Sequence, residues 1–106
     1  MSAYAIGLLR RVEAGEQILA YLQGIDATLA PFGGRFIIHG GKQQLLEGRS
    51  PGDVIVIAFP DLSAARAWYA SAAYQAILPL RLGHAEGDVF LIEGVEVGHR
   101  ATDVLS

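Results

Sequence analysis

The sequence predicts an α+β fold of the ferredoxin-like βαββαβ type, with a four-stranded antiparallel sheet and two helices on one of its faces. Two observations favour this fold: strand-like and helical segments follow one another in that order, and the strand-like segments place apolar residues on both faces. The length of 106 residues suits a single domain. We expect residues 1–97 to form that domain and residues 98–106 to be a loose C-terminal tail.

The first half of the chain contains a predicted strand, a long helix and a second strand. Residues 3–9 combine small and branched side chains, as short strands do. Residues 13–31 predict a helix, because apolar side chains recur along one stripe at spacings of four and three: Ile18, Leu22, Ile25, Leu29 and Phe32. Pro31 and the glycine pair at 33–34 end this helix, and residues 35–39 form the second strand.

The second half begins with a turn at residues 50–53 and a third strand at residues 54–59, the strongest β signal in the chain. Asp61 is a suitable N-cap for a second helix that carries Trp68 on its apolar side. A short helical piece around residues 74–77 should stop near Pro79, because proline disrupts a helix interior. Residues 88–97 form the last strand.

Both faces of the predicted sheet are apolar. Successive side chains of a strand point to opposite faces, and all six residues from 54 to 59 are apolar. Two helices cover only one face, so the other face needs a second cover, and an identical sheet is the simplest one. We therefore expect a homodimer that packs sheet against sheet. The alternative is that a long loop or the tail folds over this face.

Several blocks spread over the chain form a specific combination: Gly33-Gly34-Arg35-Phe36, Leu46-Glu47-Gly48, Phe59-Pro60, Ala64-Ala65-Arg66-Ala67-Trp68-Tyr69, Pro79-Leu80-Arg81 and Glu93-Gly94. Together they resemble the DUF1330 family over roughly residues 3–97. The resemblance implies a dimeric α+β barrel. Proteins on that barrel include monooxygenases, isomerases and simple binding proteins, so the fold selects no reaction. Family members often carry an arginine at the position of His39 and Pro-Glu at the position of Ala72-Ala73. A role that depends on that arginine or that glutamate does not transfer to this chain.

Composition excludes several classes of function. The net charge of −3, without a cluster of Lys and Arg, argues against nucleic acid as a partner. The longest apolar run is too short to cross a membrane, the N-terminus has no signal-peptide pattern and there is no cysteine, so we expect a cytoplasmic protein. The three histidines lack metal-ligand spacing and no dinucleotide or phosphate loop is present, so we expect neither metal nor cofactor.

Arg35 and His39 are the predicted polar pair of the second strand. By regular alternation they share a face with Ile37. The Arg35 guanidinium could hold a carboxylate or enolate oxygen, and an imidazole at His39 could transfer a proton. The structural alternatives are an ion pair of Arg35 with Glu47 or Asp88, and a partly exposed histidine at a strand end.

Aromatic and basic residues around the second helix are the remaining candidates. Tyr74 follows the helix near its expected break, so its phenol could contact a ligand, and Arg81 could meet the same cavity. The structural alternatives are plain core for the aromatic residues and a surface charge for Arg81. The candidate catalytic residues are Arg35, His39 and Tyr74. The candidate substrate-binding residues are Trp68, Tyr69, Arg81 and Tyr21.

Three functions remain open at this point. The first is a cofactor-independent enzyme with a pocket between helices and sheet, acting on a modest apolar substrate with a carbonyl or carboxylate. Arg35 would hold the oxyanion, and His39 or Tyr74 would move the proton. The second is a non-catalytic module that binds a small molecule. The third is a structural dimerisation domain, against which a ligand-sized void beside Arg35 and Tyr74 would count.

Overall fold

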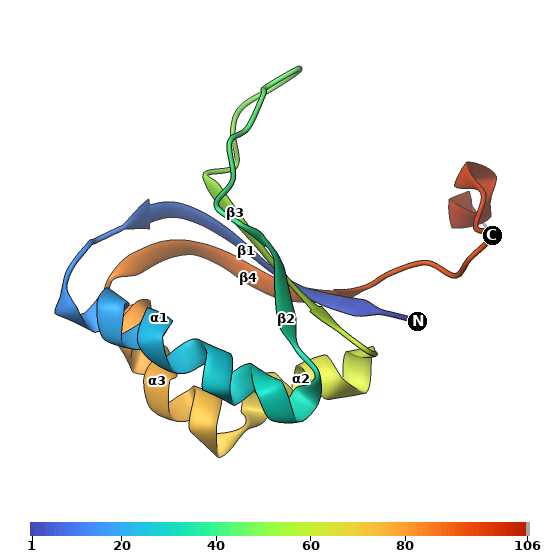
Figure 1. Ribbon diagram of the computed structural model, residues 1–106. Coiled ribbons are helices and arrows are strands. Elements are labelled where there is room, and N and C mark those ends of the chain that lie inside the picture. Colours follow the sequence, from blue (N-terminus) through green and yellow to red (C-terminus); the bar gives the residue numbers. More distant parts are fainter. Residues whose placement is uncertain (106) are drawn as a thin grey trace.

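The computed structural model describes residues 1–105 and has one antiparallel sheet with its helices on a single face (Figure 1). The strands are β1 (Ala3–Val12), β2 (Arg35–His39), β3 (Asp53–Phe59) and β4 (Ala85–Glu93), and they lie side by side in the order β2-β3-β1-β4. All three strand pairs are antiparallel. This arrangement confirms the predicted ferredoxin-like fold.

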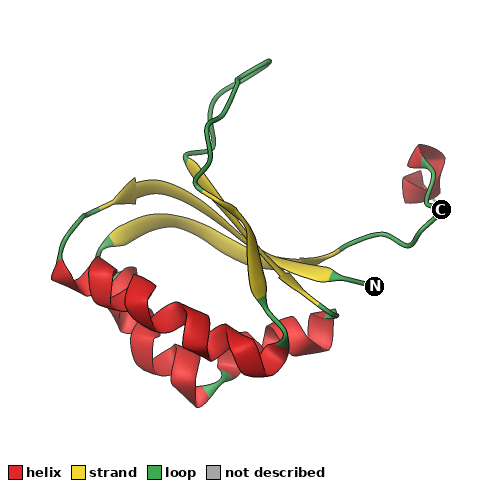
Figure 2. Ribbon diagram, in the orientation of Figure 1, coloured by secondary structure: helices red, strands yellow, loops and turns green. Residues whose placement is uncertain are grey.

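Three α-helices, not two, cover what we call the inner face of the sheet (Figure 2). They are α1 (Glu16–Leu29), α2 (Leu62–Ala70) and α3 (Ala72–Leu82), and a short 3-10 turn at Ala30–Phe32 extends α1. As predicted, Asp61 caps α2, because its carboxylate accepts a hydrogen bond from the Ala64 backbone N–H at 2.8 Å.

The additional helix, α3, is the short helical piece that was expected to stop near Pro79. It instead continues through Pro79 to Leu82, so that expectation is wrong. Proline removes one backbone donor and strains the preceding turn. Leu78 and Arg81, on either side of it, are buried against the rest of the domain. Tertiary packing therefore outweighs the local preference to end the helix.

The hydrophobic core lies between the inner face and the three helices. Trp68 of α2 is at its centre and is only 2% exposed. The indole Nε1–H donates a hydrogen bond of 3.0 Å to Thr28 Oγ1, and that hydroxyl donates to the Ile25 carbonyl oxygen at 2.7 Å. The polar atom of the largest core side chain therefore has a partner on α1, which ties the two helices together.

Strand β2 contains a β-bulge at Ile37. A bulge inserts an extra residue, so side chains before and after it no longer alternate as they do in a regular strand. His39 lies opposite Ile55, on the inner face, whereas Arg35 lies opposite Ala58, on the outer face. The expectation that Arg35, Ile37 and His39 share a face is therefore wrong, because it assumed unbroken alternation.

The opposite, or outer, face of the sheet has no helix over it within residues 1–105 (Figure 1). Strand pairing places a continuous apolar set on this face: Tyr4, Ile6, Leu8, Ile38, Val54, Val56, Ala58, Phe90 and Ile92. Phe90 and Ile92 are 44% and 50% exposed. As the sequence predicts, both faces of the sheet are apolar, and the helices of residues 1–105 cover only one of them.

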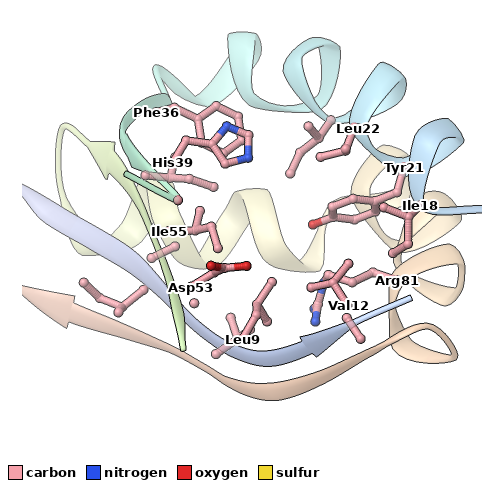
Figure 3. A pocket seen from close by; sticks show the side chains of 18 of the residues that line it. Leu9, Val12, Ile18, Tyr21, Leu22, Phe36, His39, Asp53, Ile55 and Arg81 are labelled. Atoms are coloured by element: carbon pink, nitrogen blue, oxygen red, sulfur yellow. The ribbon is translucent and has the colours of Figure 1, made fainter. Parts of the chain in front are cut away.

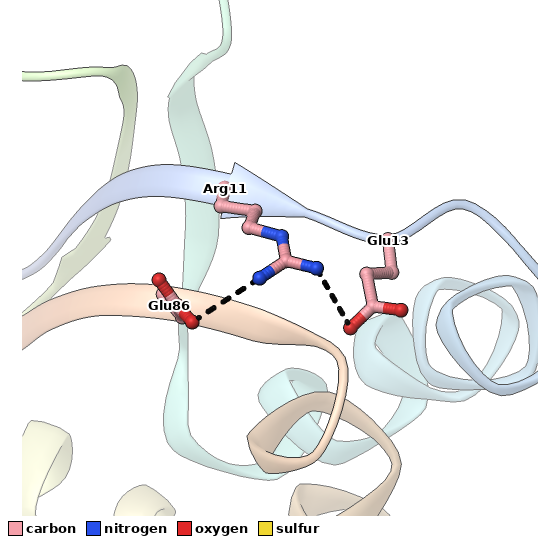
Figure 4. A network of polar contacts seen from close by, with 3 residues as sticks. All are labelled: Arg11, Glu13 and Glu86. Carbon is pink, nitrogen blue, oxygen red and sulfur yellow. Dashed lines mark hydrogen bonds and ion pairs between the residues drawn. The ribbon is translucent and has the colours of Figure 1, made fainter.

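The strands β1 and β4 differ from their predicted bounds because they pair with each other beyond an irregularity between residues 9 and 11. Strand β1 continues to Val12, and β4 begins at Ala85. At this end Arg11 pairs with Glu86 at 3.4 Å and with Glu13 at 3.7 Å (Figure 4). These side chains are exposed, so the pairs contribute little to stability.

Two segments extend away from the helices: the loop of residues 40–52 and the C-terminal residues 94–105 (Figure 1). The C-terminal segment ends in a short 3-10 helix, η2 (Ala101–Leu105). The predicted tail begins at residue 98, and its last residue, Ser106, lies outside the described residues. No helix among residues 1–105 is long and apolar enough to cross a lipid bilayer.

Candidate functional site

A cavity of about 210 Å³ lies between the inner face of the sheet and the helices (Figure 3). Its lining is mostly apolar, with β1 and β3 on one side and residues such as Ile18 and Leu22 of α1 on the other. Gly7 deepens the floor, because it has no side chain between its strand neighbours Ile55 and Val89, which also line the cavity. The site is therefore a partly open apolar space with few polar groups, which is typical of small-molecule pockets.

Two phenols and a guanidinium form one polar end of the cavity, here called the phenol–arginine cluster (Tyr21, Tyr74 and Arg81). The hydroxyls of Tyr21 and Tyr74 are 2.8 Å apart and share a hydrogen bond. The guanidinium carbon of Arg81 lies 5.8 Å from the centre of the Tyr21 ring, within the range of a cation–π contact. All three residues are buried. Helices α1 and α3 bring them together from positions far apart in the sequence.

The surroundings in the cluster keep the Tyr21 phenol neutral and the Arg81 guanidinium charged. Burial raises the pKa of the Tyr21 phenol far above its usual range; the neighbouring Tyr74 acts in the same direction, and Arg81 opposes it. For Arg81, burial acts to lower the pKa, but the phenol oxygens of Tyr74 and Tyr21 outweigh it, so the pKa is raised. The cluster can therefore donate hydrogen bonds and present a positive charge to a bound molecule.

The other polar groups of the lining are His39 and Asp53 (Figure 3). The His39 ring is stacked on Phe36, with ring centres 4.5 Å apart and planes nearly parallel. Asp53, which was expected in a turn, is the first residue of β3 and lies opposite Leu9. Both polar residues are exposed, so this end of the cavity is its open end. Within residues 1–105, no three His, Asp or Glu side chains gather where they could hold a metal ion.

The structure separates Arg35 from the residues with which it was grouped. Arg35 lies on the outer face and does not line the cavity. The structural alternative of an Arg35 ion pair with Asp88 is not formed either, because Asp88 pairs with Arg10 at 2.8 Å. The basic residue beside Tyr74 in the cavity is Arg81, which was grouped with the substrate-binding residues.

The aromatic candidates divide between the core and the cavity. Trp68 belongs to the core and also lines the cavity. Tyr69 packs against Trp68 edge to face, with ring centres 6.1 Å apart, and is not among the lining residues. The alternative of a surface charge for Arg81 is wrong, because this side chain is buried. Asp53 was missed, although residues 53, 55 and 57 share the inner face by simple alternation.

The family comparison covers most of the chain. The domain of unknown function DUF1330 matches residues 2–95. The chain belongs to the DUF1330 family. No curated protein matches the sequence significantly.

Solved structures of low sequence identity share the fold of this DUF1330 protein. The methylated RPA0582 protein from Rhodopseudomonas palustris has a TM-score of 0.68 at 17% identity, with 92% of this chain and 84% of that chain covered. SnoaB, a cofactor-independent oxygenase from Streptomyces nogalater, has a TM-score of 0.59 at 14% identity, with 93% and 98% covered. A dimeric ferredoxin-like protein of unknown function from Jannaschia sp. CCS1 has a TM-score of 0.57 at 15% identity, with 89% and 100% covered.

Proposed function

We propose that this DUF1330 protein is a cofactor-independent enzyme that converts a small, largely apolar molecule in the cavity. The observation that carries the proposal is an apolar space with separate polar groups, which is how binding sites fix the orientation of a substrate. An apolar cavity of about 150 Å³ binds benzene. The cavity of about 210 Å³ therefore has room for one aromatic ring with a short substituent. SnoaB, described as a cofactor-independent oxygenase, has the same fold, which supports chemistry without a cofactor.

The polar groups of the lining have complementary chemical roles. The phenol–arginine cluster would stabilise negative charge on a substrate oxygen, since preorganised donors act strongly where water is excluded. His39, at the open end, would accept or return the proton. Arg81 thus takes the role that the sequence assigned to Arg35, for which the cavity geometry offers no support. Tyr74 keeps its predicted place as a hydrogen-bond donor beside the substrate.

We also infer that two identical chains pack against each other through their outer faces in the cytoplasm. The exposed Phe90 and Ile92 belong to a continuous apolar face that no described segment covers. Apolar sheet faces of this kind are stable when buried against another layer. The Jannaschia protein, which shares the fold, is described as dimeric. The absence of cysteine favours a reducing compartment.

Filling the cavity from its floor tests the proposed function. A Cβ added at Gly7 would meet Ile55 and Val89 only at ordinary contact distances of 3.6 and 4.0 Å, so Gly7→Leu should fold and occupy the cavity. Gly41→Leu adds the same atoms in open space and is the matched control. We expect single-ring phenol and quinol probes to raise the melting temperature of the wild type and of Gly41→Leu, but not of Gly7→Leu.

Turnover is then measured with the probes that bind, by mass spectrometry after aerobic incubation. We expect product with the wild type and with Gly41→Leu, and none with Gly7→Leu. Probe binding that is unchanged in Gly7→Leu would contradict the proposal, because it would place the ligand elsewhere.

One observation favours a second function, a non-catalytic binding module. The hydroxyls of Tyr21 and Tyr74 hydrogen-bond each other at 2.8 Å, so the phenols are held in place, as in a preorganised recognition surface. Saturable binding that is lost in Gly7→Leu, without product from any probe, would favour this function. The third function, a purely structural domain, is disfavoured by the cavity beside Tyr74.

A further inference from the structure

Arg81 stands out among the arginines of the chain. Arg10 and Arg11 are exposed, and each pairs with a carboxylate on the neighbouring strand. Arg81 is only 8% exposed, and no ion pair joins it to any carboxylate within residues 1–105. A buried charge is expensive unless it is paired. The protein thus holds a positive charge inside an apolar cavity without a matching negative one.

The groups near Arg81 compensate its charge only in part. The Tyr21 ring gives a cation–π contact at 5.8 Å, and the phenol oxygens of Tyr21 and Tyr74 are close enough to stabilise the charge. Neither of these two side chains is a carboxylate. Among the described residues that line the cavity, Asp53 alone has a carboxylate; its side chain is exposed, and it forms no ion pair with Arg81 (Figure 3).

We infer that the cavity selects an organic monoanion, a carboxylate on a single-ring apolar body, with its charged group on Arg81. The inference rests on the proposed function and names its substrate class. A planar guanidinium matches the two oxygens of a carboxylate in a bidentate pair. The two phenols share two hydroxyl protons, of which one lies between their oxygens and the other is free for the ligand.

The lining also sets the orientation of this anion. Its apolar body would lie over Gly7 and Ile57, where the floor has no polar side chain. The negative charge of Asp53 opposes a second negative group at the open end and repels a carboxylate bound in reverse. An acid with one charged end and one apolar end fits this distribution, and a dicarboxylate does not.

The test compares trans-cinnamate with cinnamamide, which have nearly the same shape and differ in charge. Isothermal titration calorimetry with the wild type should show cinnamate binding at least about tenfold more tightly than the amide. Arg81→Met should remove that preference. Arg81→Lys should restore part of it, because lysine keeps the positive charge but cannot form the bidentate pair that a planar guanidinium makes with a carboxylate. Arg66→Met, at an exposed position of α2, is the matched control and should behave as the wild type.

Asp53→Asn provides a test of opposite sign. Removing the carboxylate should strengthen cinnamate binding about two- to fivefold and leave cinnamamide unchanged. Equal wild-type affinities for acid and amide would overturn the inference without any variant, and so would a preference that survives in Arg81→Met. If cinnamate fails while neutral quinol probes bind and are displaced by Gly7→Leu, the anion is wrong and the proposed function stands. If Gly7→Leu alters no binding at all, both fail.

Discussion

The two faces of the sheet have similar side chains and different fates. Ile57 and Phe59 on the inner face are 4% and 2% exposed, whereas Phe90 and Ile92 on the outer face are about half exposed. Residues from both faces alternate along the same strands. Apolar residues on both faces of a strand therefore show that each face of the sheet must be buried. They do not show which face the helices of the same chain bury.

The inner face differs from the outer in a second way. Its three helices do not fill the whole layer, and the remaining space contains the phenol–arginine cluster. The outer face is apolar except at its margins, where Arg35 lies. We infer chemistry on the inner face and assembly on the outer face, and the predictions below test this division.

The largest effect is expected for the inner core. Trp68→Ala should lower the free energy of unfolding by about 3–5 kcal/mol, because it leaves a large cavity and removes the hydrogen bond between the indole and Thr28. Leu46→Ala, at a position 92% exposed in the loop of residues 40–52, should change it by less than about 0.5 kcal/mol. Urea denaturation at fixed protein concentration measures both. Similar losses for the two variants would place the core elsewhere.

The next effect concerns the outer face. Phe90→Glu would bury a charge twice in a symmetric contact, so we expect the dimer dissociation constant to rise about a hundredfold, or ~3 kcal/mol. Sedimentation at micromolar loading should then show the 11.3 kDa chain instead of twice that mass. Leu19→Glu, at an exposed position of α1, is the control and should stay dimeric. A wild type that sediments as a compact single chain would contradict the inference that the outer face serves assembly.

A smaller effect is expected at alkaline pH. Because burial raises the pKa of Tyr21 in the folded protein, the unfolded chain loses this proton first as the pH rises above 10. Folding is then disfavoured by up to ~1.4 kcal/mol per pH unit from this group. Tyr21→Phe should be about 1 kcal/mol less stable at pH 7, through the lost hydrogen bond to Tyr74, and the gap should narrow above pH 10. Urea denaturation at pH 7 and above pH 10 measures the stability difference between Tyr21→Phe and the wild type. A difference that stays constant with pH would argue against a buried Tyr21.

The smallest effect separates two arginines. Arg35→Met should change cinnamate binding by less than about twofold, since this side chain lies on the face opposite the cavity. Arg81→Met in the same titration should lose most of the binding. The reverse result would show that the bulge at Ile37 does not decide the face of Arg35.

Much of the architecture could be predicted from local patterns. The order of strands and helices, the cap at Asp61 and the apolar character of both sheet faces follow from residue periodicity, which depends on near neighbours alone. The candidate site could be predicted only in part. Tyr74 and His39 do line the cavity, whereas Arg35 does not and Asp53 was missed.

The sequence by itself determined that this chain folds as a βαββαβ domain with two apolar sheet faces, because alternation and helical spacing are properties of the chain. Tertiary structure decided the rest. The bulge at Ile37 arises from pairing with β3, and it directs Arg35 away from His39. Helix α3 continues past Pro79 because the side chains on either side of this proline are buried. This continuation brings Arg81 to the phenols of Tyr21 and Tyr74. Strand register and burial depend on contacts between distant segments, which no local pattern records.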